Sequence, residues 1–230
     1  MNGFYSIAID GPGGAGKSSL AKRLSAAFNF IYIDTGAIYR TVGLAAHRKG
    51  IDSKNENDIA LILPELKIGM VYNENGEQCM ILNGEDVSKD IRMPEISLLA
   101  SDVATLPVVR SFLLETQRKF ARENNVIMDG RDIGTVVLPE AELKIYLTAD
   151  VHIRAERRLK ELLQKGVEAN FEDVLEEMKQ RDWQDMNREI APLKQADDAI
   201  VVDTSAIDVD ESFKVLRELV IKTLAVEPEA

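Results

Sequence analysis

Short apolar runs that end at aspartate or glycine alternate along this chain with longer amphipathic stretches. The runs with the length of buried strands are Phe4–Asp10, Phe30–Asp34, Val126–Asp129, Leu143–Thr148 and Ala199–Asp203. The stretches that keep apolar residues on one helical face are 17–28, Pro107–Arg122, Val151–Lys165, Phe171–Asn187 and Asp208–Leu224. This alternation predicts an α/β fold with a largely parallel, doubly wound sheet, helices on both faces and right-handed crossovers.

Residues 60–100 break this rhythm. Within them, 66–84 reads "LKIGMVYNENGEQCMILNG", two β-like runs around the turn "NENG". This pattern predicts a β-hairpin, inserted between helical segments of the parallel core. At the other end of the chain, the last five residues, "VEPEA", are expected to fray.

The composition excludes several classes of protein. At 230 residues the chain suits one sizeable domain with an inserted subdomain. Cys79 is its only cysteine, so an intrachain disulfide cannot form, and His47 and His152 lack partners at the spacing of zinc ligands. No apolar run approaches the roughly 18 residues of a membrane span. The first ten residues read as a strand, not as a secretory signal, so we expect a cytoplasmic protein without a membrane partner.

The net charge of −11 argues against general affinity for nucleic acid. A polyanionic substrate would therefore need local clusters of positive charge, which makes the placement of arginines informative.

A glycine-rich loop follows the first predicted strand and opens the first predicted helix. It matches the pattern GxxxxGK(S/T) in full. With one flanking serine, its residues are Gly11, Pro12, Gly13, Gly14, Ala15, Gly16, Lys17, Ser18 and Ser19. Glycines let backbone N–H groups turn inward around an anion, and the helix N-terminus adds positive charge. Lys17 can bridge the β- and γ-phosphates of a nucleoside triphosphate, and the Ser18 hydroxyl can ligate Mg²⁺. The alternative is a glycine-rich turn without a ligand.

Two further segments follow predicted strands: "DTGAIYR" at 34–40 and "IMDGRDIGTVV" at 127–137. Because the strands of a doubly wound sheet end at one crevice, both should lie near the phosphate loop. Asp129 stands where an acid could orient Mg²⁺ or its waters. Either segment, taken alone, could also be a capped turn between strand and helix.

A third segment, "RDWQDMNREIAPL" at 181–193, places Arg181, Asp185 and Arg188 on one helical face. Arg154, Arg157 and Arg158 share a face one helix earlier. Each set could be a solvated, self-paired charge face. Each could instead bind the phosphates of a nucleotide, for which the planar guanidinium is suited.

These segments, together with "GEDVSKDIR" at 84–92, resemble the motif series of the bacterial cytidylate kinase family, a group of nucleoside monophosphate (NMP) kinases. The resemblance extends from the phosphate loop to about Asp203. It implies a core with a five-stranded parallel sheet at about 1–35, 105–150 and 190–226. It also implies an NMP-binding region with its insert at about 36–104 and a helical lid at about 151–189.

The resemblance also implies roles for individual residues. Arg40, Arg131 and Arg188 would hold the acceptor phosphate, and Arg181 with Asp185 would meet the ribose. The residues that would surround the cytosine are Thr35, Ser101, Arg110 and Asp132. Taken by sequence alone, Ser101 and Arg110 suit a structural role. The residues that would act on the transferring group are Lys17, Arg131, Arg157, Arg158 and Arg188.

The function implied is phosphoryl transfer from ATP to CMP or dCMP with Mg²⁺, in pyrimidine nucleotide metabolism, by a monomer. A GTPase-type switch is the first alternative, but it would need a guanine-reading NKxD motif, which this sequence lacks. A nucleotide-binding regulator without catalysis would not need an arginine-rich acceptor side. A kinase acting on AMP, shikimate or another small acceptor is the nearest enzymatic alternative.

Overall fold

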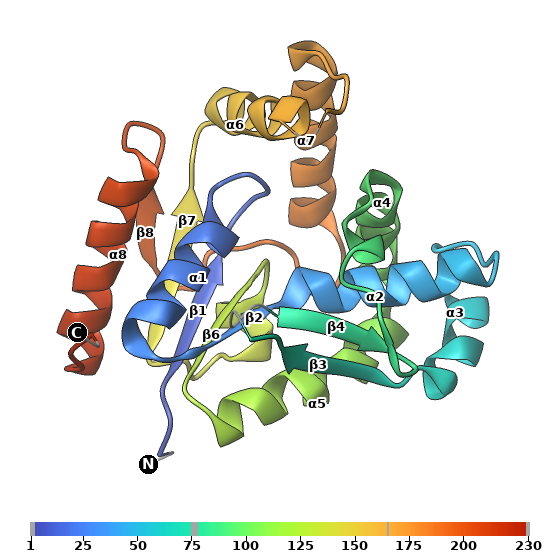
Figure 1. Cartoon of the computed structure of the whole chain (residues 1–230), viewed down its shortest axis with the longest axis horizontal. Coiled ribbons are helices and arrows are strands. Elements are labelled where there is room, and N and C mark those ends of the chain that lie inside the picture. The colour runs from blue at the N-terminus through green and yellow to red at the C-terminus, as the bar shows by residue number, and fades with distance from the viewer. Residues whose placement is uncertain (1–2, 75–77, 165, 229–230) are drawn as a thin grey trace. The chain divides into compact units, whose positions relative to one another are not determined.

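A five-stranded parallel sheet forms the centre of the fold. The computed structural model describes residues 3–74, 78–164 and 166–228, and within this part of the chain the strand order is β2-β6-β1-β7-β8 (Figure 1). The strands are β1 (Ser6–Asp10), β2 (Ile31–Asp34), β6 (Val126–Gly130), β7 (Leu143–Thr148) and β8 (Ile200–Asp203). β1 pairs in parallel with β6 and β7, and β8 pairs in parallel with β7. The strands that follow β1 in the sequence thus lie on both sides of it, β2 and β6 on one side and β7 and β8 on the other. This reversal of strand order puts a topological switch point beside β1. The predicted fold class is confirmed.

The chain divides into two compact units, Met1–Tyr32 with Ala121–Ala230, and Ile33–Phe120. The helices of the first unit are α1 (Lys17–Phe28), α6 (Val151–Gln164), α7 (Phe171–Asn187) and α8 (Val209–Leu224), with a short π-helix η3 (Ile133–Val137). The predicted helical stretches agree with these bounds to within a residue. The predicted last residue of α6, Lys165, lies outside the described residues, as do the final two residues of the tail.

The core of the first unit is built on β1. Leu20 and Leu24 of α1 are four residues apart and so share one helical face, as do Leu216 and Val220 of α8. These side chains and Ile9 of β1 are at most 1% exposed. α1 and α8 lie side by side over the sheet (Figure 1). Each buried side chain of this size stabilises the fold by about 1.5–3 kcal/mol, so the start of α1 is held firmly against the end of β1.

The second unit contains the predicted hairpin. Its elements are α2 (Thr35–Arg48), α3 (Glu56–Ile62), η1 (Leu63–Glu65), β3 (Ile68–Tyr72), β4 (Gln78–Leu82), β5 (Glu85–Asp86), η2 (Asp90–Arg92) and α4 (Pro94–Val103). α5 (Pro107–Glu123) then leads back into the first unit. β3 and β4 pair antiparallel, and β5 adds a short third strand that the sequence pattern does not predict. Of the predicted turn "NENG", the last two residues lie outside the described ones.

α2 and α4 pack closely in the second unit because of a glycine. A Cβ added to Gly43 of α2 would lie only 3.1 Å from the backbone nitrogen of Ala100 in α4. β4 is tied to the start of α2, since Gln78 Oε1 accepts a hydrogen bond from the N–H of Asp34 at 2.8 Å. These contacts hold α2 and α4, which carry candidate substrate-binding residues.

Among the described residues, no single helix has the length and apolarity to cross a membrane. Only α4 and α5 taken together, at an angle of 98°, pass that test as a bent pair.

Candidate active site

The glycine-rich loop joins β1 to α1, and two of its glycines could not be replaced without conflict. Gly11 has a φ of +148°, and a Cβ there would lie 1.9 Å from the backbone oxygen of Leu147. Gly14 has a φ of +75°, and its Cβ would lie 2.9 Å from Cε of Met178 in α7. Both positions combine a left-handed backbone with close neighbours, so only glycine permits this loop path.

Lys17 curls back into the loop. Its Nζ donates hydrogen bonds to the carbonyl oxygens of Gly11 and Pro12, each at 2.7 Å. Burial and, after it, the nearby positive charge of Arg131 lower the pKa of Lys17 to about 7, although carboxylates oppose the shift. A phosphate group would offer the ammonium a charged acceptor in place of two neutral carbonyls, and charge-assisted hydrogen bonds are the stronger ones.

A hydroxyl and a carboxylate meet beside this loop. Ser18 Oγ donates to Asp129 Oδ2 at 2.8 Å, and Tyr32 Oη donates to Asp129 Oδ1 at 2.9 Å. Asp129 is 4% exposed, so Tyr32 and Ser18 fix the orientation of its carboxylate. Hydroxyl and carboxylate oxygens are ligands that suit Mg²⁺, and this pair fits the metal role predicted for Ser18 and Asp129.

Two ion pairs connect the segment after β6 with the region at the end of α7. Arg131 Nε donates to Asp185 Oδ2 at 2.7 Å, and Arg188 Nη2 donates to Asp132 Oδ1 at 3.2 Å. All four residues have predicted substrate roles, and they come from segments more than 50 positions apart. The structure thus brings the acceptor-side residues of the first unit together.

This cluster lies against the phosphate loop. A Cβ on Gly13 would lie 3.7 Å from Nη2 of Arg131. Burial alone would raise the pKa of Asp185, but the charges of Arg131 and Arg181 outweigh it and hold that pKa below its ordinary value. Asp185 therefore carries a full negative charge that keeps Arg131 in place beside the loop.

The three arginines of α6 share a helical face as predicted, but they have different partners. Arg154 is 5% exposed and donates to the carbonyl oxygens of Ala149 and Gly13 and, at 2.6 Å, to Asp182 of α7. Arg158 lies near the surface and pairs with Glu161 of its own helix at 3.0 Å.

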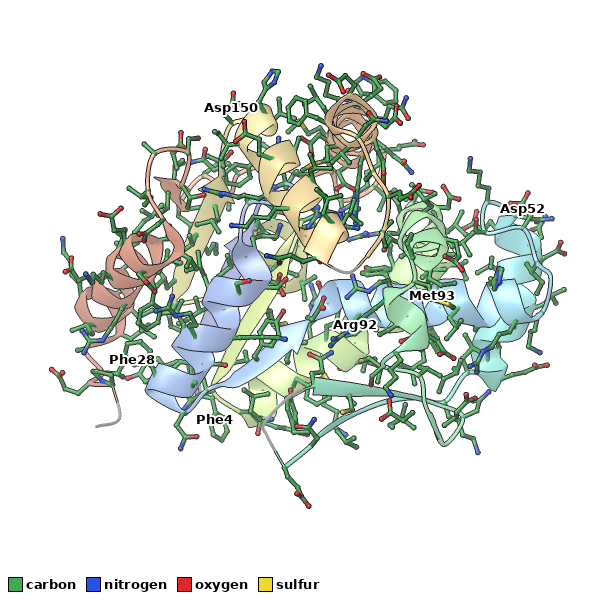
Figure 2. The ribbon with its side chains drawn as sticks, turned by 45° about the horizontal axis from the view of Figure 1, so that its top comes forward. Phe4, Phe28, Asp52, Arg92, Met93 and Asp150 are labelled. Atoms are coloured by element: carbon green, nitrogen blue, oxygen red, sulfur yellow. The ribbon has the colours of Figure 1, made fainter. Side chains whose placement is uncertain are left out.

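Arg157 reaches from α6 to the loop after β8. Its guanidinium donates to the backbone oxygen of Thr204 at 2.7 Å and to Thr204 Oγ1 at 3.1 Å. Asp150, labelled in Figure 2 at the start of α6, donates its backbone N–H to Ser205 Oγ at 2.8 Å. The catalytic roles of Arg157 and Arg158 remain predictions, since both side chains have structural partners here.

The other candidate substrate residues belong to the second unit. Thr35 is buried and is the first residue of α2. Asp34 caps that helix by accepting from the N–H of Ala37 at 2.9 Å, and it pairs with Arg40 at 2.7 Å. The capped turn considered for this segment is thus present, and it orients the guanidinium of Arg40.

Ser101 and Arg110 occupy α4 and α5 of the same unit. Arg110 donates to the backbone oxygen of Ala104 at 3.1 Å and lies over the ring of Tyr39 at 5.6 Å. The hydroxyl oxygen of Ser101 is buried and finds no hydrogen-bond partner among the residues that the structure describes. An unsatisfied buried hydroxyl costs stability, and the substrate-binding role of Ser101 stays a prediction.

Sequence reasoning missed three residues that support this site. Tyr32 orients Asp129, Asp182 holds Arg154, and Asp10 bonds the segment after β6. Asp10 had a detectable signal, because a charged residue directly before Gly11 ends an otherwise apolar strand. The roles of Tyr32 and Asp182 depend on partners remote in the sequence.

Comparisons with known proteins agree with this geometry. A sequence model of the family described as "Cytidylate kinase" matches residues 7–222. A cytidylate kinase from Caldicellulosiruptor bescii is 47% identical over 220 residues, covering 95% of this chain and 96% of that protein. One from Lactobacillus johnsonii is 44% identical over 222 residues, covering 96% of both.

Among solved structures, an uncharacterized protein from Eubacterium ventriosum is similar with a TM-score of 0.53 and 14% identity. That alignment covers 94% of this chain and 98% of the other. At this identity the likeness concerns the fold alone.

Proposed function

Because the chain belongs to the cytidylate kinase family and is a kinase, we propose that it transfers the γ-phosphoryl group of ATP to CMP or dCMP. The products are CDP or dCDP and ADP. The observation that carries the proposal is the position of Arg131, whose guanidinium lies at Gly13 of the phosphate loop while Asp185 holds it. An arginine so placed can bind an acceptor phosphate next to the donor phosphates.

Donor binding is the task of the phosphate loop. Its backbone N–H groups and the N-terminus of α1 receive the phosphates of ATP, and the ammonium of Lys17 exchanges its two carbonyl partners for phosphate oxygens. Ser18 and Asp129 would hold Mg²⁺, which neutralises charge on the donor phosphates when bound. The oxygen donor set of these two side chains is the support for the metal.

Acceptor binding is the task of the residues named from the family's motifs. We assign the acceptor phosphate to Arg40, Arg131 and Arg188, and the ribose to Arg181 and Asp185. The base-reading residues in this assignment are Thr35, Ser101, Arg110 and Asp132. The buried hydroxyl oxygen of Ser101, which has no hydrogen-bond partner among the described residues, supports its assignment to a polar base.

The transfer itself needs alignment and positive charge. The acceptor phosphate is already anionic at neutral pH, so no general base is needed. Lys17 and the arginines stabilise the oxygens of the moving phosphoryl group, and Arg157 and Arg158 of α6 contribute when the lid region, about 151–189, closes. Closure excludes water, which would otherwise accept the phosphoryl group. We also propose that the enzyme is a cytoplasmic monomer that acts in pyrimidine nucleotide metabolism.

A coupled assay that follows ADP release tests the proposal. ATP and Mg²⁺ are supplied alone or with CMP, dCMP, UMP, AMP or shikimate. We expect rapid ADP release with CMP and dCMP, little with the other acceptors, and very little with ATP alone. Faster transfer to AMP or shikimate than to CMP would contradict the proposed acceptor. An ADP release rate that is the same with and without each acceptor would contradict a kinase of this kind.

A further inference from the structure

Asp10 connects the phosphate loop to the segment that carries the acceptor-side charges. It is the last residue of β1 and is 4% exposed. Its Oδ1 accepts a hydrogen bond from the N–H of Ile133 at 2.8 Å, and its Oδ2 accepts one from the N–H of Gly134 at 2.7 Å. These two donors begin η3 and directly follow the pair Arg131–Asp132. The side chain of Asp10 therefore connects the end of β1, directly before the phosphate loop, to the residues directly after Arg131–Asp132.

The carboxylate of Asp10 is costly to keep at this position. Burial raises the pKa of Asp10 to about 6, although the hydrogen bonds from Gly134 and Ile133 oppose the shift. Asp132 adds negative charge nearby and Lys17 adds positive charge. A buried charge destabilises a fold unless its partners compensate. Asp10 therefore differs from the apolar side chains of the core, whose burial is favourable by itself.

The segment that Asp10 holds is also confined by Lys144 of β7. A Cβ on Gly134 would lie 3.1 Å from Cδ of Lys144 and 3.4 Å from Oδ2 of Asp10. Lys144 of β7 is itself held, because its Nζ donates to both carboxylate oxygens of Asp198, at 2.9 and 2.8 Å. The stem of Lys144 and the carboxylate of Asp10 thus both lie close to Gly134, and the start of η3 has little freedom to shift.

We propose that Asp10 is a positioning residue, which fixes Arg131 and Asp132 relative to the phosphate loop and so aligns the acceptor with the donor. The proposal rests on the proposed function, because Arg131 and Asp132 are there assigned to the acceptor. In-line transfer depends on this alignment, and a displacement of about 1 Å costs on the order of 100-fold in rate.

The variant Asp10→Asn tests this role with a side chain of the same shape. An amide has only one oxygen, so one of the two N–H donors would face an NH₂ group that cannot accept. We expect kcat for CMP to fall about 10- to 100-fold while KM for ATP changes less than about 3-fold. We also expect more ADP than CDP, since water competes with a misaligned acceptor.

The variant Gly134→Ala should produce the same defect through crowding. Its methyl group would crowd the stem of Lys144 and displace the start of η3 from its place at the Asp10 carboxylate, and kcat should fall similarly. In the double variant the two losses should combine to less than their product, because both break one connection. Losses that multiply would contradict the coupling of these two residues.

A matched control is Asp208→Asn. The carboxylate of Asp208 also accepts two backbone hydrogen bonds, from Asp210 and Glu211 at 2.8 Å each, but it caps α8 at the surface. Its kcat should equal that of the unaltered enzyme. A purely structural role for Asp10 predicts the opposite pattern for Asp10→Asn, with a lowered melting temperature and normal kcat in the folded fraction.

Amide hydrogen exchange makes the test independent of the substrate. In Asp10→Asn the amides of Ile133 and Gly134 should exchange faster than in the unaltered protein. If the enzyme proves to use another acceptor, the proposed function fails, and the kcat comparison is made with that acceptor instead. Unchanged exchange at both amides, or an unchanged kcat with the accepted substrate, would overturn the role of Asp10.

Discussion

Nη1 of Arg154 in α6 donates a hydrogen bond to the backbone oxygen of Gly13 in the phosphate loop, at 3.0 Å. The same guanidinium binds Asp182 of α7 at 2.6 Å and the backbone oxygen of Ala149 at 2.9 Å. Within the first unit, α6 and α7 therefore brace the phosphate loop through one buried arginine. This relationship distinguishes Arg154 from the other two arginines on its helix face.

Replacing Arg154 by Met should destabilise the protein by about 3–5 kcal/mol. The substitution leaves the Asp182 carboxylate without its buried partner, and such an uncompensated charge is costly. Urea unfolding measures the change. The matched control is Arg158→Met, which removes an exposed pair worth less than about 1 kcal/mol. Equal destabilisation by the two variants would contradict a bracing role for Arg154.

Replacing Lys17 by Met should abolish transfer and change how stability depends on pH. The folded-state pKa of Lys17, about 7, lies below the ordinary lysine value of 10.5, so the folded state disfavours the proton. Stability from this group is present above pH 10.5 and is lost as the pH falls toward 7. The melting temperature of the variant minus that of the unaltered protein should therefore be highest near pH 7 and decrease toward pH 10.5.

Thermal unfolding across this pH range measures the Lys17 effect. The exposed residue Lys214, replaced by Met, is the control and should give a difference that hardly varies with pH. A flat difference for Lys17→Met would show that its ammonium is not disfavoured in the fold, and substantial transfer by that variant would remove it from the catalytic residues.

Alanine variants of Gly14 and Gly50 distinguish the cost of backbone strain from the cost of steric crowding. Both have positive φ, +75° and +68°, but nothing lies within 4 Å of a Cβ on Gly50, whereas one on Gly14 would meet Met178. Gly50→Ala should cost about 1–2 kcal/mol from its backbone alone. Gly14→Ala should cost about 1–3 kcal/mol more and raise KM for ATP. Equal unfolding free energies for the two variants would mean that Met178 yields without cost.

Asp132→Asn should narrow the preference for CMP over UMP. An ionised carboxylate accepts from the exocyclic amine of cytosine and repels the carbonyl of uracil, a mismatch worth roughly 1–3 kcal/mol. An amide can rotate and donate to uracil. The ratio of kcat/KM for CMP to that for UMP measures the effect. Because Asp132 also pairs with Arg188, the competing expectation is an equal loss with both acceptors, at an unchanged ratio.

Local order in the first unit follows closely from the sequence. The predicted bounds of α1, α7 and β7 match the structure, and the loop between β1 and α1 is the predicted one. Such features depend on residue spacing and on glycine conformation, which are local properties. The apolar pattern does not predict α2, where alanine, glycine and threonine are frequent, because packing against α4 stabilises that helix.

The candidate residues of the phosphate loop could be named from the sequence because one continuous segment carries them. The partners of the charged residues could not, and only the tertiary structure decided them. Arg131 pairs with Asp185 across 54 positions, and Asp10 accepts from Gly134 across 124. Spacing along a helix tells which residues share a face. It does not tell which of several opposite charges a charged side chain will pair with. The pairing depends on where strands and helices bring distant segments together and on which charged groups are buried there and therefore need a partner.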